Sequence, residues 1–369
     1  MRVPFSFLTE QFANPEPVFD KIREFLKRCD FTLGEDLTVF EGRYAKYCGT
    51  KHAIGVGSGT DAIFLSLRAL GVKPGDEVIS APNSFIATTG AIVQAGARPV
   101  YVDVTEEMTL DVGKVEGAIT EKTRAIVPVH WAGNPCDMEP LLALAKKYQL
   151  VVVEDACQAL GAKLNGRPVG SMGDAGAFST HPLKPLHVWG DGGVIVTNSD
   201  TLAVKLRLLR NHGLAGRDTV DSYGYNSRFD NLQAIVGNVV MDSLDATIDQ
   251  RIAHAEKFDR ALGDRKFFSC LRVPKRDVQK KHVFHLYQVY VQKRELLLGF
   301  LNRHGIEAKV HYPTPLHLQP AALGWGYSKG SFPLAENQSE FSITLPCHQY
   351  LKTEQVEFTI QKISEFYGL

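Results

Sequence analysis

The sequence predicts an α/β protein with a mostly parallel sheet that helices cover on both faces. Strand-like and helix-like segments alternate between Ala53 and Val196, which is the pattern of repeated βαβ units. Val151–Val153 is apolar without interruption, as expected of a strand buried on both faces. The chain has 369 residues, enough to bury a large core and to form two domains.

The composition excludes several classes of protein. The 41 Lys and Arg residues balance 41 Asp and Glu residues, so no overall charge attracts nucleic acid or a membrane surface. The six cysteines are scattered without a C-x-x-C pair, which indicates thiols in a reducing compartment. No long apolar stretch predicts a signal peptide or a membrane span. We therefore expect a cytoplasmic protein with no membrane anchor, no nucleic-acid partner and no metal site.

Two helices are predicted ahead of the first strand, at Pro15–Cys29 and about Asp36–Tyr47, because apolar residues recur at helical spacing. A strand at Ala53–Val56 follows. The small residues Gly57–Asp61 then lead into a helix over Ile63–Leu70. This arrangement presents free N–H groups and the positive end of the helix dipole, which favour an anion such as phosphate. Ser and Thr at this place are also ordinary helix caps.

Strands and helices continue to alternate through the middle of the chain. A strand at Glu77–Ala81 precedes Phe85, which begins a helix that runs to Ala95. The other predicted segments are strands at Pro99–Val104 and Ala125–Val129, a helix at Met138–Tyr148, a strand beginning at Val194–Val196 and a helix at Ala203–Asn211.

The second part of the chain predicts a smaller domain. One long helix is expected from Leu232 to about Leu262, carrying the chain out of the first domain. Strand-like Phe284–Val291 and helix-like Arg294–His304 then indicate a small α/β unit. We expect a large domain at residues 1–245, including the N-terminal helices, and a small C-terminal domain at residues 246–369.

Chemistry-bearing residues cluster around the strand at Val151–Val153. Asp155 ends that strand, and Ser179 and Lys184 lie in the next turn region, before a Gly-rich stretch. Ligands of α/β sheets bind at the carboxyl ends of strands. Pyridoxal phosphate needs a lysine for its aldehyde, an acid for its ring nitrogen, and hydroxyls or amides for its phosphate. A lone Asp or Lys is usually a cap or a surface group, but their occurrence together with Gln158 favours a cofactor site.

Several motifs, in order, resemble the DegT/DnrJ/EryC1/StrS sugar aminotransferase family. Glu154–Ala159 matches its E-D-A-C/A-Q-A motif. Ser179–Lys184 matches S-F-H/Y-x-x-K except that Thr180 replaces Phe, and Gly190–Gly193 matches the closing G-D/E-G-G. The resemblance implies a pyridoxal 5'-phosphate-dependent aminotransferase with the fold type I architecture of aspartate aminotransferase.

The resemblance also implies roles for individual residues. Lys184 would hold the cofactor aldehyde and move protons, and Asp155 would bind the ring nitrogen. Phe85 would lie flat on the ring, although a core Phe is the alternative. His130, in an H-x-x-G turn, is either near the cofactor or a satisfied core histidine. The remaining implied cofactor contacts are Gly59, Thr60 and Asp61 at the phosphate, Gln158, and Ser179.

Later motifs imply a shared site and a substrate pocket. Asn226 and Arg228 lie in a stretch resembling the family's G-x-N-x-R-M motif, whose Asn reaches the cofactor phosphate of the other subunit of a homodimer. Arg228 is then either near the substrate or a support for its loop. His311 and Tyr312 belong to H-Y-P-x-P-L-H, which lines the family's substrate pocket. Trp189 either stacks on the sugar or fills its loop.

The implied reaction transfers an amino group from glutamate to a nucleotide-linked keto sugar in amino-sugar biosynthesis. Gly190 follows Lys184 by six places, as in members that aminate a 3-keto carbon, whereas many 4-keto members have five. This spacing favours a 3-keto sugar. One alternative is a sugar dehydratase on the same fold, which has histidine in place of the lysine. The other is a non-enzymatic cofactor-binding regulator, which should carry a DNA-binding module or a basic patch.

Overall fold

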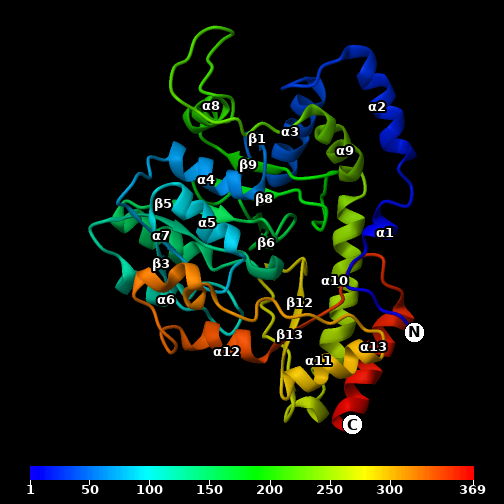
Figure 1. Ribbon diagram of the computed structural model, residues 1–369. Coiled ribbons are helices and arrows are strands. Elements are labelled where there is room, and N and C mark those ends of the chain that lie inside the picture. Colours follow the sequence, from blue (N-terminus) through cyan, green and yellow to red (C-terminus); the bar gives the residue numbers. More distant parts are fainter.

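A seven-stranded sheet forms the centre of the computed structural model, which describes residues 1–369 (Figure 1). Only β9 runs antiparallel to its neighbours, β1 and β8, so the prediction of a mostly parallel sheet is confirmed. In sheet order the strands are β1 (His52–Val56), β9 (Gly193–Thr197), β8 (Ala175–Ser179), β5 (Val151–Asp155), β4 (Thr123–Val127), β2 (Glu77–Ser80) and β3 (Arg98–Tyr101).

Alternate residues of the sheet pack into two separate cores, one on each face. Val153 and Ile195 belong to the core under one layer of helices, and Val152 and Val194 belong to the other. The first layer contains α4 (Gly59–Ala69), α5 (Ile86–Gln94) and α8 (Asp200–Leu209). The second contains α3 (Glu35–Cys48), α7 (Met138–Tyr148) and α9 (Asn231–Met241). The other N-terminal and connecting helices are α1 (Leu8–Gln11), α2 (Glu16–Arg28) and α6 (Val112–Val115).

A smaller α/β unit with its own core follows, at the bottom of Figure 1. Its antiparallel sheet has the order β10-β12-β13, with strands Leu271–Arg272, Tyr287–Val291 and Ser342–Leu345. Its helices are α10 (Leu244–Leu262), α11 (Arg294–Arg303) and α13 (Thr353–Tyr367). A third small sheet, β11-β6-β7, comprises Lys280–Lys281, Lys163–Leu164 and Arg167–Pro168 and joins the two units.

Two segments cross between these units. The N-terminus lies beside the small one, where Val3 is buried in its core and pairs with Ile306 (Figure 1). In the other direction, α12 (Pro333–Phe341) packs on the large unit, where the N–H of Ala335 donates to the Asp103 carboxylate at 3.0 Å. We still propose a boundary between the two domains at residues 245 and 246. The N-terminus and α12 are two segments that each pack on the unit beyond that boundary.

The prediction of a single helix from Leu232 to about Leu262 is wrong, because the segment forms two helices. The chain breaks between α9 and α10, where the N–H groups of Asp242 and Ser243 bond to carbonyls three residues back rather than four. Asp and Ser favour helix ends because their short polar side chains compete for backbone hydrogen bonds. The break separates a helix that packs on the sheet from one that enters the small unit.

None of the helices combines the length and the apolar character that crossing a membrane would require.

Candidate active site

The site is centred on the carboxylate of Asp155, the buried last residue of β5. Its Oδ2 accepts a hydrogen bond from Thr88 Oγ1 at 2.7 Å, and its Oδ1 accepts one from the N–H of Cys157 at 3.1 Å. Thr88 comes from the first turn of α5 and Cys157 from the turn after β5, so two separate segments fix the two oxygens. An ionised carboxylate keeps further lone pairs for a ligand.

Lys184 lies in the loop that joins β8 to β9. Its backbone N–H donates to the carbonyl of His181 at 2.8 Å, which closes a turn, and its Nζ lies 3.4 Å from Nε2 of His285. Burial in the pocket lowers the pKa of the Lys184 amine, against the opposing charge of Asp155. A lowered pKa increases the fraction of neutral amine, which is the form that acts as nucleophile and base.

The N-terminus of α4 lies beside the end of β8 because glycines allow the two segments to come close. A Cβ on Gly59 would lie 2.7 Å from the Cβ of Ser179, and one on Gly193 would lie 2.1 Å from the carbonyl oxygen of Ser58. Ser58 caps the helix through its Oγ, which accepts from the N–H of Asp61 at 3.0 Å. The helix does not use its first N–H groups, so this end is suited to a phosphate.

Asn226 is placed beside the same helix end in its own chain. The neighbouring Ser227 donates through Oγ to Oδ2 of Asp61 at 2.8 Å, and Asn226 itself is exposed. Nη1 of Arg228 donates to Oδ1 of Asn211 at 3.0 Å. Of the two roles left open for Arg228, this contact favours support of the loop.

Aromatic and imidazole side chains border the pocket on the side of the small unit. Phe85 caps α5 and is 51% exposed, so it is not a core residue. Its ring lies 5.9 Å from that of Tyr312. Burial raises the pKa of Tyr312 to about 12, which keeps the phenol as a donor. Burial also lowers the pKa of His311 to about 4, so this imidazole is neutral at neutral pH.

His130 is a satisfied core histidine. Its Nδ1 accepts from the N–H of Cys136 at 3.0 Å, and its Nε2 lies 2.9 Å from Oε2 of Glu154. Both ring nitrogens are therefore used within the protein. Nearby, Oε1 of Gln158 accepts from the N–H of Ala132 at 2.8 Å, which ties the predicted cofactor residue to the His130 turn.

Trp189 lies against the N-terminal segments rather than with Phe85 and Tyr312. Its ring makes edge contacts with Phe12 at 6.4 Å and Phe19 at 5.5 Å. Its backbone N–H and carbonyl both bond to the side-chain amide of Gln233, at 2.8 and 2.9 Å. These contacts favour the role of filling the loop over that of stacking on a sugar.

The motifs did not indicate His285. It precedes β12 in the small unit, 101 residues after Lys184. Buried Arg251 of α10 lies behind it and donates through Nη1 to the carbonyls of His285 and Cys347, at 3.4 and 3.2 Å. Tertiary packing alone brings His285 to the lysine, so no local pattern could have marked it.

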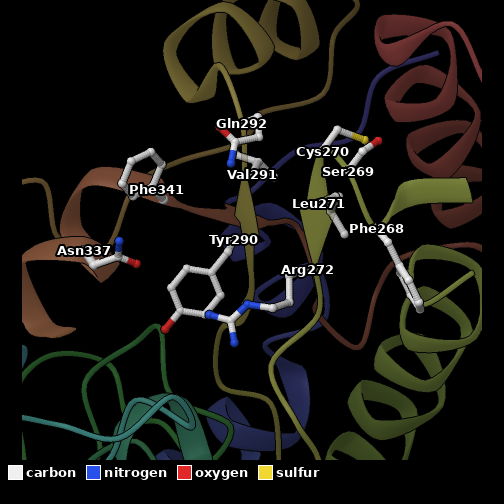
Figure 2. A pocket seen from close by; sticks show the side chains of 10 residues that line it. All are labelled: Phe268, Ser269, Cys270, Leu271, Arg272, Tyr290, Val291, Gln292, Asn337 and Phe341. Atoms are coloured by element: carbon white, nitrogen blue, oxygen red, sulfur yellow. The ribbon is translucent and has the colours of Figure 1, made fainter. Parts of the chain in front are cut away.

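A separate pocket lies on the small unit, and none of the predicted site residues lines it. In Figure 2, Arg272 of β10 lies over the ring of Tyr290 of β12, and the centroid distance is 4.3 Å. The lining residues are Phe268, Ser269, Cys270, Leu271, Arg272, Tyr290, Val291, Gln292, Asn337 and Phe341. This pocket is lined by no lysine and no acid.

Comparison with known sequences relates nearly the whole chain to one family. The sequence model of the DegT/DnrJ/EryC1/StrS aminotransferase family matches residues 15–364. A pleiotropic regulatory protein of Geobacillus stearothermophilus is 43% identical over 100% of this chain and 99% of its own. The dTDP-3-amino-3,4,6-trideoxy-alpha-D-glucose transaminase of Streptomyces venezuelae is 39% identical over 99% of this chain and 96% of its own. The UDP-N-acetyl-3-dehydro-alpha-D-glucosamine 3-aminotransferase of Acidithiobacillus ferrooxidans is 38% identical over 96% of this chain and 95% of its own.

Solved structures show the same fold. DesV of Streptomyces venezuelae, in complex with a ketimine intermediate, superposes with a TM-score of 0.95 at 38% identity, covering 99% of this chain and 98% of that one. NtdA of Bacillus subtilis, with bound cofactor PMP, superposes with a TM-score of 0.93 at 31% identity, covering 100% and 86%.

Proposed function

Because the chain belongs to the DegT/DnrJ/EryC1/StrS aminotransferase family, which uses pyridoxal phosphate, we propose that it moves an amino group from glutamate to a nucleotide-linked keto sugar. The observation that carries the proposal is the position of Lys184. Burial lowers the pKa of its amine, and the carboxylate of Asp155, which Thr88 and Cys157 fix, is close enough for its charge to oppose that shift. The product would serve amino-sugar biosynthesis.

The protein groups fit pyridoxal phosphate at each of its polar ends. The N–H groups of Gly59 and Thr60, with the Ser179 hydroxyl, would hold the phosphate. The Asp155 carboxylate would accept a hydrogen bond from the protonated ring nitrogen and keep it protonated, and the exposed face of Phe85 would stack on the ring. Asp61 and Gln158 would complete this set from the two adjoining turns.

The catalytic work of the chain itself is proton transfer by Lys184. When bound, the cofactor supplies an electron sink for the bond that breaks at the donor's α-carbon. The neutral Nζ of Lys184 would remove the proton from that carbon, and it would return a proton to the new amino carbon of the sugar in the second half-reaction. The phenol of Tyr312 and the neutral imidazole of His311 would bind sugar or phosphate oxygens.

A 3-keto sugar is the acceptor that we propose. Gly190 lies six places after Lys184, and the names of the Streptomyces venezuelae and Acidithiobacillus ferrooxidans relatives place nitrogen at carbon 3 of a dTDP or UDP sugar. Matched 3-amino and 4-amino sugar nucleotides, each incubated with 2-oxoglutarate, test the choice in the reverse direction. Faster glutamate formation from the 3-amino compound is expected. Preference for the 4-amino compound would contradict the choice of a 3-keto acceptor but not the proposed aminotransferase activity.

The active unit would be a cytoplasmic homodimer with two shared sites. Asn226 is exposed, and exposed apolar side chains lie near it in sequence, at Tyr225 (37%) and Leu232 (38%). A second copy packed on this surface would cover the apolar side chains and bring Asn226 to the partner's cofactor phosphate. All six cysteines are free thiols, which supports a reducing compartment.

A further inference from the structure

His285 has a position that the reaction proposed above does not yet explain. Its Nε2 lies 3.4 Å from Nζ of Lys184, and its Nδ1 is buried without a hydrogen-bond partner. The backbone around it is held from both sides. The His285 carbonyl accepts from Arg251, and the N–H of the next residue, Leu286, donates to the carbonyl of Ala132 at 3.3 Å. The backbone that carries the imidazole is therefore held in place, whereas the lysine side chain has four rotatable bonds.

The surroundings keep this imidazole uncharged. Burial, and then the positive charges of Lys184 and Arg251, lower the pKa of His285 well below its ordinary value. A neutral imidazole can exchange a hydrogen bond with an amine without adding positive charge to the pocket. The charged and titratable groups that act on Lys184 or His285 from the surrounding elements are Asp155, Cys157, His181, Arg251 and His311.

We propose that His285 is a positioning residue for the catalytic lysine. It holds the Lys184 amine in the pocket whenever that amine is not bonded to the cofactor. Ordering a free lysine side chain costs conformational entropy. The hydrogen bond to His285 limits the positions of Nζ before it is needed. The inference rests on the proposed assignment of Lys184 as the cofactor lysine.

The test measures how fast the cofactor-free protein captures pyridoxal phosphate covalently at Lys184, followed by absorbance and by borohydride trapping with peptide mass spectrometry. His285→Phe keeps a planar ring without nitrogen, and we expect capture to slow by about tenfold, as for the loss of one hydrogen bond. His285→Gln keeps a polar group, and capture within about threefold of the parent is expected.

Two controls separate this proposal from the assignment on which it rests. Lys184→Ala should capture no cofactor, and covalent capture elsewhere would contradict the lysine assignment itself. Non-covalent affinity for pyridoxamine phosphate should be unchanged in His285→Phe, because that ligand forms no bond to the lysine.

Capture at the parental rate in His285→Phe, with intact pyridoxamine phosphate binding, would overturn the positioning role. If His285→Phe binds pyridoxamine phosphate poorly, His285→Ala replaces it in the same assay. Parental capture by His285→Ala would equally overturn the proposal, and slow capture with rescue by His285→Gln would support it.

Discussion

Asp155 shows how single side chains make this pocket reactive. Thr88 and the N–H of Cys157 fix its two oxygens, so the carboxylate is oriented before any ligand binds. Asp155→Asn keeps both contacts possible but removes the charge opposite the ring nitrogen. We expect the single-turnover rate with glutamate to fall by several orders of magnitude, corresponding to ~4 kcal/mol or more for a lost buried charge partner.

Thr88→Val provides the matched control for that variant. It removes one orienting hydrogen bond and keeps the charge, so a loss of about tenfold in the same single-turnover rate is expected. An Asp155→Asn rate within threefold of the parent would show that the carboxylate is only structural. Cofactor affinity, measured separately by equilibrium dialysis, distinguishes a variant that reacts slowly from one that does not bind the cofactor.

At the scale of single residues, the sequence predicted those site residues that lie in short, continuous motifs. Asp155, Ser179 and Lys184 lie in short motifs at strand ends, and their proximity follows from sheet geometry. His285 could not be found in this way, because it comes from the small unit, 101 residues after Lys184. The packing of Trp189 against Phe12 and Phe19 was also beyond the sequence, since it depends on where the N-terminal helices fold.

At the scale of elements, the N-terminal segment packs against His311, which we propose as a substrate-binding residue. Phe5 stacks on His311 with ring centroids 5.5 Å apart, and its N–H donates to Oε2 of Glu307 at 3.0 Å. Phe5→Ala should remove this stacking and leave the His311 ring held through the Thr344 hydroxyl, 2.9 Å from its Nδ1. We expect the KM for the sugar to rise several-fold with little change in kcat, since Lys184 is untouched.

Phe268→Ala is the control for this prediction. Phe268 is 70% exposed on the same small unit, and it lines the separate pocket of Figure 2. The same truncation there should change neither KM nor kcat. Equal effects of the two variants on KM would show that Phe5 acts through general stability, which thermal melting of both proteins would reveal.

Across the whole molecule, the shared site is testable by mixing variants. Asn226→Ala and Lys184→Ala chains should each be inactive or nearly so as homodimers. A mixed dimer keeps one site with both residues, so activity of the order of a quarter of the parental value is expected after random subunit exchange. No recovery, with exchange proved by native mass spectrometry, would contradict a site built from two chains.

Acid should destabilise the fold through buried histidines. Burial lowers the pKa of three of them, His187, His311 and His348, to about 4. As the pH falls from about 6.5 to 4, these three side chains bind protons in the unfolded chain but not in the folded chain, so the free energy of unfolding decreases, and the contribution of these three groups levels off below pH 4.

At pH 5 each of these histidines lowers the free energy of unfolding by roughly 2 kcal/mol. Urea unfolding at pH 5 and at pH 7 measures this loss. His187→Phe, which replaces a buried ring packed against Phe12, should show a smaller loss between these two pH values. An identical loss in that variant would show that His187 is not one of the groups responsible.

The overall architecture was the most predictable level. Uninterrupted apolar strands alternating with helices implied a mostly parallel sheet, and the two cores on its faces follow from that pattern. The reversal of β9 could not be read from periodicity, because strand direction depends on how the loop at Lys184 turns the chain back beside β8. The break at Asp242 was missed because apolar periodicity continues across it.

The most direct test of the account follows one nitrogen atom. The protein loaded with pyridoxal phosphate is given ¹⁵N-glutamate and a dTDP- or UDP-linked 3-keto sugar, and the product is examined by mass spectrometry and NMR. We expect ¹⁵N on carbon 3 of the sugar, and none with Lys184→Ala. Binding of the cofactor at Lys184 without transfer of ¹⁵N to any nucleotide-linked keto sugar in a panel would contradict it.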